Sequence, residues 1–139
     1  MSSENTQNYL LPHLQIENDE RGVGTASGTF VVVPEYLNGM GVLHGGITAG
    51  LMDVICHRAA GCHLGTDKAL GQRRWPVTLS LSLNFVGTAS MGTLSLQAKT
   101  TGGGRKTCFC DGRIEDSDGN LIATAQGTFK LLEGRLRRY

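Results

Sequence analysis

Apolar positions follow a helical period in one segment of the chain and a strand period in the segments after it. In residues 45–64 they recur with the i, i+4, i+7, i+8 spacing of one helix face. Nearly all other positions of this segment are small or apolar, so we expect a helix that is buried on almost every side. The residues that mark its apolar ridge are Ile47, Leu51, Val54 and Ile55.

From residue 78 onward the apolar period becomes two, which is typical of β-strands with one buried face. Strands are expected at residues 78–86, 93–100, 106–116 and 121–132, separated by turns rich in Gly, Asp and Asn. The first of these strands should be half-buried. Its apolar face would carry Leu79, Leu81, Leu83 and Phe85, and its polar face Thr78, Ser80, Ser82 and Asn84.

The N-terminal part should add two strands between Leu14 and Val33, joined by a turn at residues 18–24. Residues 34–46 contain Pro, Asn and several Gly, which indicates a loop. Consecutive strands with short turns favour an antiparallel sheet. One apolar helix packed on such a sheet gives an α+β fold.

Composition agrees with an ordinary single-domain protein. A length of 139 residues suits one domain over residues 1–139. The formal net charge of +1 gives no general attraction to nucleic acid or to an anionic membrane. No apolar run is long enough to span a membrane, and the N-terminus lacks a signal-peptide pattern, so we expect a cytoplasmic protein that binds neither nucleic acid nor membrane.

The four cysteines do not indicate a metal or redox site. Cys56 and Cys62 lie six residues apart in the expected helix, and Cys108 and Cys110 form C-x-C in an expected strand. Neither spacing is a zinc or redox motif. We therefore expect buried or half-buried free thiols in a reducing compartment, with no metal and no cofactor.

One carboxylate stands inside the apolar helix, at Asp53. At about 100° per residue, Gly50 and His57 lie on the same side of the helix. An ionised carboxylate is costly to bury without partners. Asp53 is therefore either an exposed residue paired with His57 at i, i+4 or part of a functional site, and the spacing leaves both interpretations open.

The start of the same helix favours the second interpretation. Residues 44–46 read His-Gly-Gly, which places bare backbone amides at a helix N-terminus, where the donors are unsatisfied and the dipole is positive. Such amides suit an oxyanion hole. Gly45 and Asp53 are eight residues apart, about 12 Å along a helix, whereas a nucleophile must stand about 3–3.5 Å from the carbon that it attacks. If both groups act on one carbonyl, Asp53 must come from a second chain of an isologous dimer.

These residues resemble the hotdog-fold thioesterases, in particular the phenylacetate-pathway (PaaI-like) acyl-CoA thioesterases. The resemblance rests on Asn38, the His-Gly-Gly segment and Asp53, followed by an ordered series of strand motifs. Those motifs are "VTLSLSLNF", "GGGRKT" and "DSDGNLIATAQGTF", so that the match extends from Asn38 to Phe129.

The resemblance implies a curved antiparallel sheet wrapped around one central helix, with active sites at a dimer interface and dimers often paired into tetramers. The substrate would be an acyl-CoA thioester, hydrolysed without a metal to a free acid and CoA. The Gly45 amide would polarise the carbonyl, and Asp53 would attack it or activate a water. The supporting residues by the same resemblance are Asn38, which places the nucleophile or water, His44, which shapes the oxyanion loop, Thr78, which positions water, and Gly46, which contacts the substrate.

The chain departs from this pattern after its first long strand. Relatives often read N-F-x-R-P there, whereas this chain reads "NFVGTAS". If the arginine of relatives meets the CoA phosphates, other basic residues must do so here. The candidates are Arg105 and Lys106 in the Gly-rich turn, and Arg73 and Arg74 before the strand.

Two other activities fit the same residues. A hotdog hydratase or dehydratase would need a general acid and base, for which Asp53 and His57 could serve. A non-catalytic acyl-CoA binding module would bind its ligand without turnover. His57 could instead be an ordinary helix histidine or tune Asp53, and Thr78 could be an ordinary residue of the sheet surface.

Overall fold

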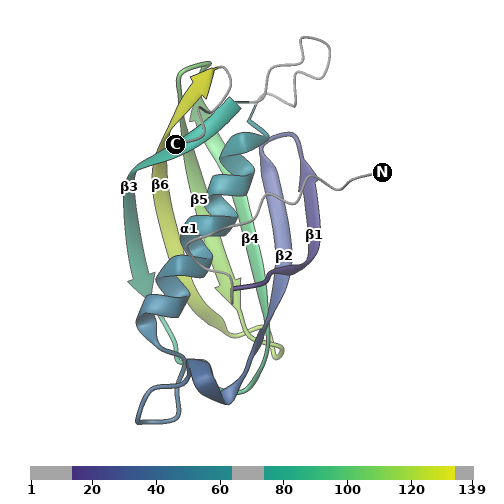
Figure 1. Cartoon of the computed structure of the whole chain (residues 1–139), viewed down its shortest axis with the longest axis vertical. Coiled ribbons are helices and arrows are strands. Elements are labelled where there is room, and N and C mark those ends of the chain that lie inside the picture. Colours follow the sequence, from purple (N-terminus) through teal and green to yellow (C-terminus); the bar gives the residue numbers. More distant parts are fainter. Residues whose placement is uncertain (1–13, 64–73, 134–139) are drawn as a thin grey trace, which may run out of the picture.

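The computed structural model describes residues 14–63 and 74–133. Within these residues one long α-helix packs on a six-stranded antiparallel sheet, in the strand order β1-β2-β4-β5-β6-β3 (Figure 1). This confirms the expected α+β class. The elements are β1 (Glu17–Gly22), β2 (Thr25–Val32), the 3-10 helix η1 (Pro34–Tyr36), α1 (Gly45–Gly61), β3 (Arg74–Phe85), β4 (Gly92–Gly103), β5 (Thr107–Glu115) and β6 (Leu121–Glu133).

The core lies between α1 and the inner face of the sheet. The buried stripe of α1 is rotated by about one residue from the predicted ridge, because Ile47 and Val54 are only half-buried. The other side of α1 is half-buried in the single chain, so that full burial is confined to the side that faces the sheet. The helix ends at Gly61, before the predicted limit at Leu64, which lies outside the described residues. Its buried residues are Thr48, Leu51, Met52, Ile55, Cys56, Ala59 and Ala60.

A glycine on β5 lets the helix approach the sheet closely. A Cβ atom on Gly112 would lie 2.4 Å from Met52 Sδ and 2.8 Å from Cys56 Sγ, distances at which something must move. Gly112 is buried and pairs with Ala98 on one side and Ala125 on the other. Small residues along the middle of the sheet therefore set the depth at which α1 lies.

The first strand falls where a turn was predicted. Residues 17–22 form β1, paired with β2 through Glu20–Ser27 and Gly22–Thr25, and the turn is confined to Val23 and Gly24. All six residues of β1 are exposed. Backbone hydrogen bonds to β2 hold this edge strand, and none of its side chains is buried. Its sequence therefore has no alternation of apolar and polar residues that would predict a strand.

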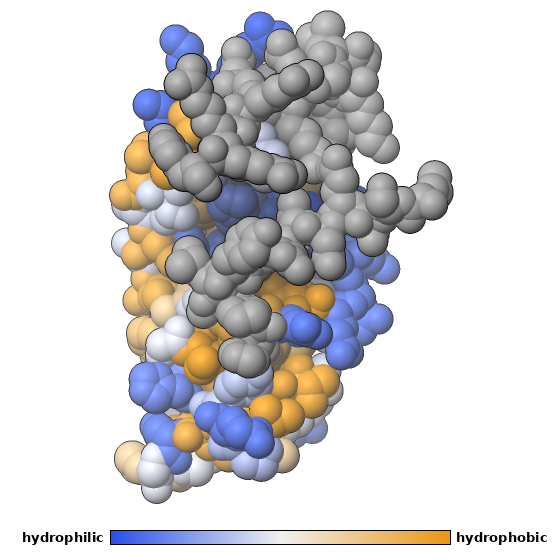
Figure 2. All heavy atoms as spheres, in the orientation of Figure 1, coloured by the Kyte–Doolittle hydropathy of each residue, from blue (hydrophilic) through white to orange (hydrophobic). Residues whose placement is uncertain are grey.

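The other sheet edge is β3, and it is more exposed than the sequence pattern predicts. Leu79 is 57% exposed and Phe85 is 58% exposed, while Leu81 and Leu83 are partly buried. Figure 2 shows apolar surface along the side of the molecule where Figure 1 places β3. In the single chain the expected half-buried pattern therefore holds for Leu81 and Leu83, which pack against the core, whereas Leu79 and Phe85 are exposed at this edge. β3 also pairs with β6 and not with its sequence neighbour β4.

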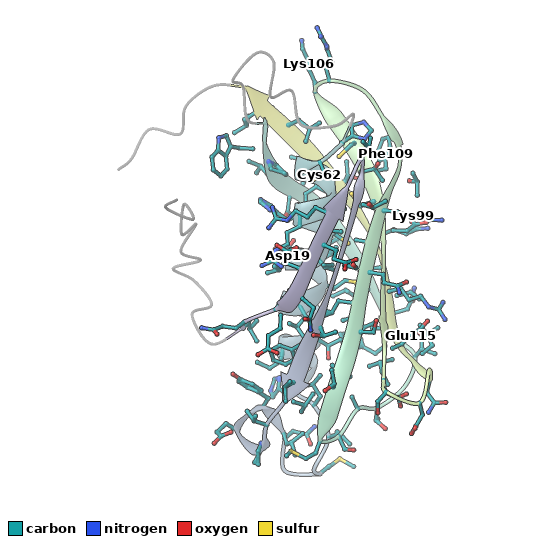
Figure 3. The ribbon with its side chains drawn as sticks, turned by 90° about the vertical axis from the view of Figure 1, so that its right-hand side faces the viewer. Asp19, Cys62, Lys99, Lys106, Phe109 and Glu115 are labelled. Carbon is teal, nitrogen blue, oxygen red and sulfur yellow. The ribbon has the colours of Figure 1, made fainter. Side chains whose placement is uncertain are left out.

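The outer face of the sheet is polar. Lys99 and Glu115 project from it, away from α1 (Figure 3). A broad hollow of about 900 Å³ on this face is lined by residues such as Gln97, Asp111 and Gln126. Neither Asp53 nor the His-Gly-Gly segment lines this hollow. No helix among the described residues combines the length and the apolar character required to cross a membrane.

Candidate active site

The start of α1 leaves one backbone amide free. His44 is the N-cap, and its ring Nδ1 accepts a hydrogen bond from the Gly46 amide at 3.0 Å. The amides of Ile47 and Thr48 donate to the His44 carbonyl, at 3.0 and 3.2 Å. For the Gly45 amide, the described part of the chain supplies no acceptor. Of the two glycines, Gly45 is thus the one that can donate to a bound oxygen, while Gly46 is engaged by the cap.

The loop before α1 is held by Asn38. Its side-chain oxygen accepts hydrogen bonds from the amides of Met40 at 2.9 Å and Val42 at 3.3 Å. The backbone N–H of Asn38 in turn donates a hydrogen bond to the Val42 carbonyl oxygen at 2.8 Å. The Asn38 side chain therefore holds the shape of this loop, six residues before the His44 cap.

Asp53 is linked to the sheet through Thr78. The Thr78 hydroxyl donates to Asp53 Oδ1 at 2.8 Å, and Asp53 is partly exposed. The sequence pattern placed Thr78 on the polar face with Ser80, and the structure corrects this. The register shifts between Thr78, which pairs with Phe129, and Ser80, which pairs with Thr128. This β-bulge at Leu79 turns Thr78 toward α1, whereas strict alternation would turn it away.

His57, one helical turn after Asp53, is also bonded to β3. Its Nε2 lies 2.9 Å from the Pro76 carbonyl oxygen, and since that oxygen can only accept, Nε2 carries the proton. Burial lowers the pKa of the imidazole below its ordinary value of 6.5, and the bond to Pro76 and the Asp53 charge offset only part of that effect. A neutral His57 bonded to the backbone is not the charged i, i+4 partner of Asp53 that the spacing allowed.

The cysteine beside Asp53 is not a candidate nucleophile. Burial, and to a smaller extent the charge of Asp53, raise the pKa of the Cys56 thiol to about 12, so it stays protonated. All four cysteines are free and buried, as the sequence predicted for the state of these thiols.

The aromatic ring of Phe85 is a neighbour of Gly45 that the sequence did not identify. A Cβ atom on Gly45 would lie 3.7 Å from Phe85 Cε1, an ordinary contact distance. The exposed ring at the end of β3 therefore stands beside the free amide. The alternation along β3 predicted that Phe85 lies on the apolar face of the strand. The sequence pattern does not predict that the end of β3 lies beside the start of α1.

The candidate phosphate ligands lie at the other end of the helix. Arg105 and Lys106 are exposed in the turn between β4 and β5, which Figure 1 places near the end of α1, and Figure 3 shows Lys106 at its tip. Gly103 in this turn has φ +123°, and a Cβ there would lie 2.4 Å from the Thr107 carbonyl oxygen, so the turn requires glycine. Arg74 begins β3, and Arg73 lies outside the described residues.

Comparisons with known proteins show the family and the fold of the chain. A family model described as the thioesterase superfamily matches residues 40–123. A Saccharolobus solfataricus protein named as an esterase is 29% identical over 103 residues, which cover 74% of this chain and 69% of that protein. The solved structure of a conserved protein from Pseudomonas aeruginosa is 26% identical, with a TM-score of 0.80, over 95% of this chain and 100% of that one.

The fold is also that of the E. coli PaaI protein from the phenylacetic acid degradation operon. That structure is 22% identical to this chain, with a TM-score of 0.79, and the match covers 92% of this chain and 87% of that one. These likenesses confirm the predicted hotdog architecture.

Proposed function

Because the chain belongs to the thioesterase superfamily and is thereby a thioester hydrolase, we propose that its substrate is an acyl-CoA. Its products would be a free acid and CoA. The observation that carries the proposal is the pairing of two groups on one helix. These are the free Gly45 amide at its start and, eight residues later, the Asp53 carboxylate held by Thr78.

The chemistry follows from these two groups. The Gly45 amide donates a hydrogen bond to the thioester oxygen and stabilises the negative charge that develops there. Asp53 acts as the general base for a water or as the nucleophile. Since the Thr78 hydroxyl bonds Oδ1, Oδ2 is the oxygen available for either role. In the general-base route Asp53 takes a proton from the water, whose oxygen bonds the acyl carbon as the C–S bond breaks, and the CoA thiolate takes up a proton to leave as a thiol. In the nucleophile route Oδ2 forms the C–O bond, and a water then hydrolyses the acyl-Asp53 anhydride to the free acid.

The helix geometry makes the proposed enzyme a homodimer. Gly45 and Asp53 of one chain are separated by about 12 Å along α1, so each site would combine Gly45 of one subunit with Asp53 of its partner. The open apolar edge formed by β3 supports this assembly, because Leu79 and Phe85 are both more than half exposed in one chain. Pairing of dimers into tetramers belongs to the same proposal.

The remaining parts of the proposal concern the substrate's nucleotide end and the cell. Arg105, Lys106 and Arg74 would meet the CoA phosphates. Arg105 and Lys106 lie near the end of α1, away from Gly45 of the same chain, and an antiparallel pair of helices would bring them toward Gly45 of the partner. Asn38 and His44 would hold the oxyanion loop in shape. The protein would be one hotdog domain over residues 1–139, without a cofactor, in the cytoplasm.

The hydratase alternative is disfavoured by the position of His57. In that reading His57 would exchange a proton with the substrate as one member of the acid and base pair. Here Nε2–H is engaged by the Pro76 carbonyl. The other alternative, a binding module without turnover, is distinguished from an enzyme by the thiol-release assay below.

Release of free thiol from short, long and aromatic acyl-CoA substrates tests the proposal. We expect the wild-type protein to release thiol from at least one of them, and Asp53→Asn to lower kcat by about 10²-fold or more. Asp118→Asn, in an exposed turn, is the matched control and should keep full activity. Binding of acyl-CoA without thiol release, addition of water to a 2-enoyl-CoA in place of thiol release, or full activity of Asp53→Asn would each contradict the proposal.

A further inference from the structure

Two hydrogen bonds join α1 to β3 side by side. One runs from the Thr78 hydroxyl to Asp53 at 2.8 Å, and the other from His57 to the Pro76 carbonyl at 2.9 Å. On the helix the two residues are four apart, a rise of about 6 Å, and on the strand two apart, about 6.6 Å. The matching spacings let both bonds form without distortion, so that the position of one bond constrains the other.

The Pro76 carbonyl is available to His57 because of its place in the sheet. Pro76 lies opposite Leu131 of β6, whose amide donates away from β3, to the Lys106 carbonyl at 2.8 Å. In an antiparallel pair the amide and carbonyl of one residue point to the same side, so Pro76 and Leu131 are not a hydrogen-bonded pair. The Pro76 carbonyl therefore points to the open edge, where carbonyls normally lack a partner. His57 supplies that partner.

The bond lies just ahead of the irregular part of the strand. Pro76 precedes Thr78 by two residues, and the bulge follows at Leu79. A bulge increases the local twist and bend of a strand. Within the described residues of one chain β3 pairs with β6 alone, so a bond from α1 is a second support that helps to keep Thr78 on Asp53. His57 is the side chain of α1 that provides it.

We propose that His57 is a positioning residue, which ties Pro76 to α1 and so keeps the Thr78 hydroxyl on the Asp53 carboxylate. His57 does not exchange protons with the substrate in this role. It aligns the carboxylate by way of Thr78, so the second oxygen of Asp53 faces the reacting group. The kinetic consequence rests on the proposed thioesterase function, whereas the structural consequence does not.

Kinetics of two variants test the positioning role. His57→Met removes the donor at similar volume, and His57→Gln keeps an N–H near the same place. We expect His57→Met to lower kcat about tenfold with KM changed less than about twofold, because misplacement of a reacting group costs rate. His57→Gln should recover most of that loss. An unchanged kcat in His57→Met, or an equal loss in both variants, would overturn the proposal.

A double-mutant cycle separates positioning from general support of the fold. If His57 acts through Thr78, then His57→Met should lower kcat less than about twofold further in a Thr78→Val background. Losses that multiply would mean that His57 acts independently of Thr78, and would refute the proposal. Thermal unfolding of each variant checks that the fold is retained.

A measurement without substrate keeps the proposal testable if no acyl-CoA is hydrolysed. Nitrogen NMR of the imidazole should show the neutral Nε2–H tautomer near pH 7. The backbone amide signal of Thr78 should move in His57→Met and return toward its wild-type position in His57→Gln. An Nδ1–H tautomer, or a Thr78 signal that His57→Met leaves unchanged, would reject the positioning role even if thioesterase activity is confirmed. If these signals behave as expected and no thiol is released, the proposed function fails alone.

Discussion

Removal of a single backbone N–H tests the role of Gly45 directly. Gly45 is the first residue of α1, the helix position at which proline is best tolerated. The preceding residue, His44, has φ −59° and ψ 131°, an extended conformation that a following proline favours. The Gly45 amide has no acceptor in the described part of the chain. Gly45→Pro therefore removes the proposed oxyanion donor and no hydrogen bond of the fold.

The matched control is Gly45→Ala, which keeps the N–H. Its Cβ would lie 3.7 Å from Phe85, an ordinary contact. Loss of one oxyanion-hole donor costs about 10²–10³ in kcat, or about 2.7–4 kcal/mol of transition-state stabilisation. We expect Gly45→Pro to show a loss of this size in thiol release and Gly45→Ala to stay near wild type. A folded Gly45→Pro variant with kcat within about threefold of Gly45→Ala would refute the oxyanion role.

The same variant tests whether the site spans two subunits. Gly45→Pro and Asp53→Asn chains, co-expressed with different tags, can be purified as mixed dimers. Suppose that each site takes Gly45 from one chain and Asp53 from the other. One site of a mixed dimer then carries both substitutions, and the other site carries neither. Mixed dimers should then regain about half of the wild-type kcat per dimer, although each variant alone is nearly inactive. Mixed dimers that stay as inactive as the single variants would show that both groups act within one chain or that one does not act.

Two further predictions concern stability. Gly112→Ala should lower the free energy of unfolding by about 1–3 kcal/mol, because the new Cβ would crowd Met52 and Cys56. Urea unfolding measures this loss, and Gly102→Ala, whose Cβ meets nothing within 4 Å, is the control that should show none. Because the pKa of His57 is lowered in the folded protein, the unfolded chain binds a proton to this residue more readily. The contribution of neutral His57 to the free energy of unfolding is therefore fully present above about pH 6.5 and is lost as the pH falls below that value. Urea unfolding of wild type and His57→Gln between about pH 5 and pH 8 should show this extra acid loss in wild type alone, by at most about 1.4 kcal/mol per pH unit.

The helix and the two groups that we propose to act are predictable from local chemistry. A helical period, glycines at its start and one carboxylate inside it are all visible in a single segment, and the structure places α1 at Gly45–Gly61. Helix geometry alone then separates Gly45 from Asp53 by more than a reacting distance. The prediction of a two-subunit site therefore needs no tertiary information.

The sheet edges were harder to predict, because neighbouring strands determine their structure more than their own side chains do. β1 is fully exposed and holds its place through backbone bonds to β2, which no hydropathy pattern records. The pattern for β3 was regular, yet the strand pairs with β6 and remains open on its other side. Leu81 and Leu83 pack against the core, whereas Leu79 and Phe85 are more than half exposed at this edge.

Sequence alone determined the helical period of α1, the strand periods after it, the glycines at the helix start and the presence of a carboxylate eight residues after Gly45. Only the tertiary structure decided what that carboxylate touches. One extra residue at Leu79 reverses the alternation of β3 and turns Thr78 from the solvent face toward Asp53. A bulge depends on the register between strands that are far apart in the chain, so its position follows from the packed sheet and from no local pattern.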